Sequence, residues 1–172
     1  MSDPVDSLAQ RRRFDALCGR LRPDLYRFAF WLARDRAVAE DVVQDTLMRA
    51  WRSFDALDDE AAAKPWLLTI ARREFARRFE RKRFETVDID DPAVAGDPAL
   101  ASEEAQEVLE IRAAILALED DYREPLVLQV LMGFTTQEIA THMGLTQGAV
   151  LTRLFRARQK LKAAVMGREE GA

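Results

Sequence analysis

The sequence predicts an all-α protein made of two small helical domains, joined by a flexible acidic linker. Three observations support this prediction. Apolar residues recur at helical spacing on both sides of the middle, no segment alternates as a β-strand does, and residues 85–102 hold two prolines, one glycine and five acidic residues without periodicity. We expect domains at 1–84 and 105–167, a linker at 85–104 and a tail at 168–172.

The composition indicates a globular protein of a reducing compartment. Hydrophobic residues make up 48% of the 172 residues, enough to build cores. Cys18 is the only cysteine, so no disulfide can form within the chain. No apolar run approaches the roughly 18 residues of a membrane span, and the charged start of the sequence lacks the apolar stretch of a signal peptide. We expect a cytoplasmic protein with no membrane insertion.

The net charge of −4 hides a strong asymmetry along the chain. Residues 1–84 carry +4 and residues 122–172 carry +3, whereas residues 85–121 carry −11. Local charge decides which surface meets phosphate, so the two basic blocks keep a nucleic-acid partner open.

The first domain begins with a helical pattern over residues 24–54. Within residues 39–54, one stripe is apolar and holds Val43, Leu47, Trp51 and Phe54. A second face presents four other residues at helical spacing, namely Asp41, Gln44, Asp45 and Met48. An acidic face with a methionine suits a basic protein partner, and a plainly solvated face is the alternative.

A basic aromatic helix follows the polar break at 55–63. Pro65 suits its first turn, and residues 64–83 carry a net charge of +6 with aromatic residues interleaved. Arginines that hold phosphate and aromatics that stack on bases are what single-stranded DNA requires. The residues predicted to contact DNA here are Lys64, Trp66, Arg72, Arg73, Arg77, Arg78 and Arg81. In the alternative interpretation the apolar residues lie in the core and only the arginines meet DNA.

The C-terminal domain carries a helix-turn-helix pattern over residues 135–162, preceded by helices at about 103–118 and 121–132. Thr135 and Glu138 have the spacing of a capping box, Gly144 supplies a positive φ, and Thr146 can cap the next helix. The joint between the two helices is predicted to hold Ile139, Met143, Leu145, Val150 and Leu154.

Such a unit sets its second helix in the major groove of DNA. The residues predicted to contact this DNA are Gln147, Gly148, Ala149, Thr152, Arg153, Arg156 and Lys160, of which Arg156 and Lys160 also add charge suited to phosphates. An antiparallel helix pair with a merely solvated basic face is the alternative.

The sequence argues against catalysis. His142 is the only histidine, which excludes a multi-histidine metal site and a histidine-based triad. There is no glycine-rich phosphate loop and no pairing of a nucleophile with a histidine. We expect no enzymatic activity, no cofactor and no metal. His142 is expected to be a surface or joint-filling residue.

Taken together, these motifs resemble those of the extracytoplasmic-function sigma factors, small bacterial promoter-recognition subunits. The helix that grips the coiled-coil clamp of the polymerase β′ subunit is similar to AEDVVQDTLMRAWRSF. The element that reads and opens the −10 promoter element is similar to PWLLTIARREFARRFERKR. The region that reads −35 duplex is similar to DYREPLVLQVLMGFTTQEIATHMGLTQGAVLTRLFRARQKLK. The resemblance assigns core binding or its support to Asp41, Gln44, Asp45 and Trp51.

The resemblance implies core RNA polymerase (its β′ and β subunits) and promoter DNA as partners, with an anti-sigma factor as a further candidate. The chain departs from the family at three positions. Arg73 and Arg77 stand where asparagine and aspartate are common, and Ala149 where threonine is frequent. The competing interpretation is a free-standing helix-turn-helix regulator, which leaves the basic aromatic helix and the acidic face without a role.

Overall fold

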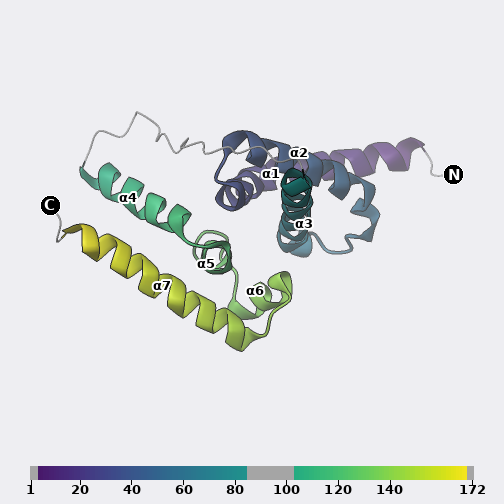
Figure 1. Cartoon of the computed structure of the whole chain (residues 1–172). Helices are drawn as coiled ribbons and strands as arrows, with labels where there is room; N and C mark the ends of the chain where they lie inside the picture. Colours follow the sequence, from purple (N-terminus) through teal and green to yellow (C-terminus); the bar gives the residue numbers. More distant parts are fainter. Residues whose placement is uncertain (1–3, 85–102, 170–172) are drawn as a thin grey trace. The chain divides into compact units, whose positions relative to one another are not determined.

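The computed structural model describes residues 4–84 and 103–169, and every regular element in those ranges is a helix (Figure 1). This confirms the all-α prediction. The chain divides into two compact units, Met1–Asp88 and Ile89–Ala172. The predicted linker lies outside the described residues up to 102, but residues 103 and 104 already begin a helix. The predicted tail is helical through residue 169 and lies outside the described residues beyond it.

Three α-helices form the first unit: α1 (Pro4–Ala33), α2 (Arg36–Arg52) and α3 (Ala63–Phe84). Helix α1 begins well before residue 24, where the predicted helical pattern starts. Its first half carries its own apolar stripe at helical spacing, which packs into the unit through Phe14, Leu17, Cys18 and Leu21. The long α1 is therefore an integral part of the core.

The predicted helical segment 24–54 is split by a tight turn. Arg34 adopts a left-handed conformation with φ 58°. Asp35 then caps α2, because its side chain accepts a hydrogen bond of 2.8 Å from the Val38 N–H. The cap sets the first turn of α2 against α1.

The core of the first unit gathers side chains from α1, the end of α2 and the start of α3. The Phe14 ring lies edge-on to Trp51 and to Phe54, each with 5.1 Å between ring centroids. Cys18 is buried in the same cluster. Burial, assisted by the negative charge of Asp15, raises the pKa of its thiol to about 11.

The polar break at 55–63 is more ordered than a plain loop. It contains two short 3₁₀ turns, η1 (Phe54–Ala56) and η2 (Glu60–Ala62), and buries Leu57 between them. Helix α1 fastens both turns, because Gln10 donates to Asp55 and Arg13 pairs with Glu60 at 2.8 Å.

The second unit contains α4 (Glu103–Ala117), α5 (Asp120–Val130), α6 (Thr136–Met143) and α7 (Gln147–Glu169). Both hydrogen bonds of the predicted capping box are present between Thr135 and Glu138. Gly144 ends α6 with φ 67°, and the Thr146 hydroxyl accepts from the Ala149 N–H at 3.2 Å. These predicted start and stop signals are confirmed.

The joint of the helix-turn-helix is tightly packed. Ile139, Val150 and Leu154 are fully buried, whereas Met143 and Leu145 are half-buried at its edge. His142 is buried as well, with its ring edge-on to Phe134 and its Nε2 3.7 Å from a Glu124 carboxylate oxygen. It is thus a joint-filling residue, as one of the two expectations had it. In neither described range is any helix long and apolar enough to cross a membrane.

Candidate functional site

Helix α2 carries the predicted protein-binding face. Val42 and Val43 turn its other side into the core, which fixes the helix in rotation. Asp41, Gln44 and Met48 are exposed and Asp45 is half-buried, so all four predicted residues reach the surface. The Met48 side chain is 55% exposed, an apolar group with no role in the core. Trp51, predicted to lie in the apolar stripe, is also an exposed aromatic.

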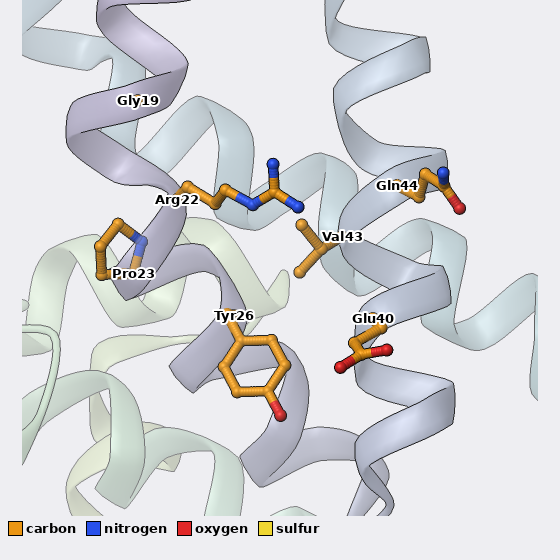
Figure 2. A pocket seen from close by; sticks show the side chains of 7 residues that line it. All are labelled: Gly19, Arg22, Pro23, Tyr26, Glu40, Val43 and Gln44. Carbon is orange, nitrogen blue, oxygen red and sulfur yellow. The ribbon is translucent and has the colours of Figure 1, made fainter.

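A pocket of about 520 Å³ opens between α1 and α2 beside this face (Figure 2). Gly19, Arg22, Pro23 and Tyr26 line it from α1, and Glu40, Val43 and Gln44 line it from α2. Gly19 leaves space because it has no side chain. Pro23 lacks the N–H that would bond to the carbonyl of residue 19, so the helix is weakened at this wall. Because Gln44 lines the pocket and also belongs to the predicted protein-binding face, the pocket borders that face.

Arg78 of α3 brings the two predicted surfaces of this unit together. Its Nε donates to Asp45 at 3.0 Å and its Nη1 donates to Asp41 at 2.9 Å. One guanidinium thus bridges two carboxylates that lie one turn apart on α2. The sequence patterns predict Arg78 on DNA and the two aspartates on a protein partner, and they do not predict this contact.

The other predicted −10 residues differ in their surroundings. Lys64 pairs with Asp24 of α1 at 2.8 Å, and Arg77 pairs with Glu74 at 3.0 Å. Arg73 is exposed and forms no ion pair within residues 4–84 and 103–169, whereas Arg72 is half-buried. The Arg81 side chain lies outside the described residues. Arg73 is thus an exposed cation that no acid in these ranges holds.

Two aromatic residues of α3, Trp66 and Phe75, are partly covered by the protein. Trp66 is half-buried and packs against the core cluster, next to the buried Ile70. Phe75 is half-buried. This arrangement favours the interpretation in which the arginines, rather than the aromatics, face the strand.

In the second unit, α7 presents the predicted DNA-reading residues on its outer side. Val150, Leu154 and Ala157 are buried, and helical spacing places Thr152 and Arg156 opposite them. The N-terminal residues Gln147 and Gly148 are exposed, and Ala149 is half-buried. The Gln147 amide donates to the Thr136 hydroxyl at 2.8 Å, which links the starts of the two helices.

Acidic residues at the start of α5 hold two of the basic side chains of α7. Arg153 pairs with Asp121 at 2.9 Å. Lys160 lies 3.4 Å from Glu119 and 5.1 Å from the centroid of the Tyr122 ring. Arg156 is exposed and has no such partner in the part of the chain that the structure describes. The predicted DNA-facing cations therefore differ in how readily they can leave the protein surface.

An apolar pair that is not among the predicted contact residues lies on the exposed side of α7. Leu151 and Phe155 lie one turn apart, and Phe155 is 61% exposed. Their signal was available, because residues at helical spacing that avoid the buried stripe must face outward. They flank Thr152 and Arg156, so the predicted DNA-reading surface also has an apolar edge.

Both units match known protein families. Residues 17–85 match sigma-70 region 2, and residues 108–161 match sigma-70 region 4. The chain is 33% identical over 144 residues to the ECF RNA polymerase sigma factor SigM of Bacillus subtilis, covering 81% of this chain and 87% of that protein. It is 34% identical over 143 residues to the ECF RNA polymerase sigma factor SigL of Mycobacterium tuberculosis, covering 80% of each.

A solved structure is also similar. It is the co-crystal structure of the sigma factor RpoE with the anti-sigma factor NepR from Bartonella quintana. The sigma factor in it is 29% identical to this chain, with a TM-score of 0.76, and the match covers 90% of this chain and 98% of that one.

Proposed function

The chain belongs to the ECF RNA polymerase sigma factors, and from this premise we propose which of its surfaces meet the polymerase and which meet the promoter. As a sigma factor it directs core RNA polymerase to specific promoters and helps to open the DNA for initiation. The assignment is supported by one observation. The predicted contact residues whose side chains the structure describes are exposed or half-buried, on helices whose opposite sides are buried.

The face of α2 made by Asp41, Gln44, Asp45 and Met48 binds the β′ subunit of core polymerase in this proposal. Carboxylates attract a basic partner, and an exposed methionine adds an adaptable apolar contact. Reversing both aspartates to lysine should abolish co-purification with core while helicity by circular dichroism is kept. Glu40→Lys reverses an acid of the same helix that is one turn from Gln44 but not among the four residues, and it tests whether the loss is specific to the two aspartates. Normal core binding by the double variant would refute the assignment.

Helix α3 holds the displaced strand of the −10 element, and Arg72 and Arg73 are its first contacts in this proposal. Unpairing costs a few kcal/mol per base, which contacts to the strand must offset. We expect Arg73→Ala to slow opening of duplex promoter in permanganate footprinting and to matter much less on a template already mismatched across −10. Trp66→Ala should reduce the permanganate signal on both templates by the same factor if Trp66 mainly supports the core. A loss confined to the duplex would return the melting role to Trp66.

The outer side of α7 reads the −35 duplex. Arg153 and Arg156 can contact guanine or phosphate, and Leu151 with Phe155 can contact thymine methyl groups. Alanine variants of these four residues can be tested on promoters in which the −35 bases are exchanged one at a time. A base whose exchange no longer changes the binding affinity of a variant is the base that the replaced side chain reads.

The remaining assignments follow from the family. We propose that the protein acts in the cytoplasm with the polymerase and has no catalytic activity of its own. An anti-sigma protein is a further proposed partner, since the similar RpoE structure is a complex with NepR. Retention of such a protein by the immobilised chain, and its displacement by core polymerase, would test this partner.

A further inference from the structure

Arg78 occupies an unusual place, since it contacts one proposed surface while it belongs to the other. It lies on the basic helix α3, but its guanidinium is bonded to the carboxylates of Asp41 and Asp45 on α2. Asp41 and Asp45 are one turn apart and repel each other, and the cation between them relieves that repulsion. In this state the acidic face is partly neutralised and the Arg78 guanidinium is occupied by the two carboxylates.

This bridge is exchangeable. The side chains of Asp41, Asp45 and Arg78 are 52%, 41% and 37% exposed, so water solvates all three groups. Exposed ion pairs contribute little to stability, and another cation or anion can replace either partner at small cost. A basic protein surface can therefore take the aspartates, and a DNA phosphate can take the arginine.

We propose that Arg78 is shared between the Asp41–Asp45 pair and the DNA strand, so that a basic partner at the aspartates frees Arg78 for a phosphate. The inference rests on the proposed core-binding surface and extends it. Because coupling between two binding sites is reciprocal, strand binding at Arg78 must strengthen the attraction of the aspartates for core by the same factor. Arg78 is thus a positioning residue that links polymerase binding to promoter opening.

The fold allows the bridge to open without loss of the helix pair. A second ion-pair cluster joins α2 to α3, in which Glu74 lies 3.2 Å from Arg49 and 3.0 Å from Arg77. Buried packing between α1, α2 and α3 is independent of Arg78. Variants of the bridge should therefore stay folded, which circular dichroism and the thermal midpoint verify.

The first experiment uses the full chain without polymerase. Its affinity for a labelled oligothymidine of about 12 nucleotides is measured by fluorescence anisotropy over a range of salt concentrations. Asp41→Asn with Asp45→Asn should raise the affinity and steepen the slope of log K against log[salt] by about 0.7, the value of one added phosphate contact. In an Arg78→Gln background the same pair of substitutions should leave the slope unchanged.

Two variants serve as controls in this double-mutant cycle. Glu40→Gln removes an acid of α2 that does not contact Arg78 and should leave the slope unchanged. Arg73→Gln removes a proposed strand contact that does not touch the aspartates, so it should lower the affinity by itself but keep the gain from the aspartate substitutions. Phosphate contacts made by the second unit are common to all variants and cancel. An equal gain from the aspartate substitutions with and without Arg78 would overturn the proposal, because it would show only general charge repulsion.

The second experiment measures the affinity of the full chain for core polymerase. Arg78→Gln should raise it by roughly fivefold, the upper limit for release of an exposed ion pair. A reduced affinity would overturn the proposal and make Arg78 a support that orients the aspartates for core. If the lysine reversal of both aspartates leaves core binding intact, the proposed core surface is wrong. The oligothymidine cycle contains no polymerase and still decides whether Arg78 is shared.

Discussion

Two arginines of α7 should make unequal contributions to promoter binding, because among the described residues an acid holds only one of them. Arg156 is free to enter the groove, whereas Arg153 must first leave Asp121, 2.9 Å away. A bidentate contact from arginine to guanine discriminates against a wrong base by about 1–3 kcal/mol. An ion pair as exposed as this one is worth about 0.2–1 kcal/mol. The free energy that Arg153 contributes to promoter binding is therefore smaller than that of Arg156 by this amount, which is a factor of up to about five in affinity.

The assay is binding of the assembled holoenzyme to a labelled promoter fragment, titrated at several salt concentrations. Arg156→Ala should weaken the matched −35 element by about 1–3 kcal/mol and a mismatched one much less. Asp121→Asn should strengthen binding by up to about fivefold at low salt, and this gain should vanish when Arg153 is also replaced by alanine. Lys162→Ala, which removes a charge further along α7, controls for the general loss of positive charge.

Two results would refute this reasoning. If Arg156→Ala weakens matched and mismatched promoters equally, the side chain contacts only phosphate. If Asp121→Asn has no effect while Arg153 is present, the ion pair does not compete with DNA.

Three further predictions concern stability. Thr135→Ala should lower the free energy of unfolding of the second unit by about 1 kcal/mol in urea titrations at pH 7. Hydrogen bonds from the Thr135 backbone N–H and hydroxyl lower the pKa of Glu138, and Thr135→Ala removes only the hydroxyl bond. That part of the cost is present above the ordinary carboxyl pKa of 4.5 and should shrink as pH falls below it, whereas the bond from the Glu138 N–H to the hydroxyl does not titrate. A cost that stays fully constant down to pH 3 would mean that the hydroxyl does not stabilise the Glu138 carboxylate. Leu128→Ala should cost about 2–5 kcal/mol, since Leu128 is fully buried, and a cost below 1 kcal/mol would mean that the site collapses around the deletion. Ionisation of Cys18 disfavours the folded first unit, so its stability should fall between pH 9 and about 11, and Cys18→Ala should remove that part of the loss when urea midpoints are compared.

The sequence predicted the helix-turn-helix in detail because its determinants are local. The capping box at Thr135 and the positive φ at Gly144 depend on residues within one turn, and both are present as expected. The buried stripe of α7 likewise follows from periodicity within a single helix. Such features can be predicted without knowing how helices pack.

Contacts between helices could not be predicted in this way. Arg78 and Asp45 are 33 residues apart, and only the packing of α3 on α2 brings them within 3.0 Å. The pairing of Arg153 with Asp121 depends in the same manner on how α5 lies against α7. The sequence identified these charges as functional but could not show which of them neutralise one another. The first half of α1 was a different kind of omission, since the spacing of Phe14, Leu17 and Cys18 was readable.

The buried Cys18 is a built-in chemical probe of opening of the first unit. The chain has one thiol, so a thiol-reactive dye reports on a single position. The reactive form is the thiolate, and burial both covers the sulfur and keeps it protonated, so labelling must proceed through transient opening of the surrounding helices. The labelling rate then measures how often the first unit opens, whatever the second unit does. If core polymerase binds only the closed form, the labelling rate of Cys18 should fall in proportion to the fraction of chains bound to core.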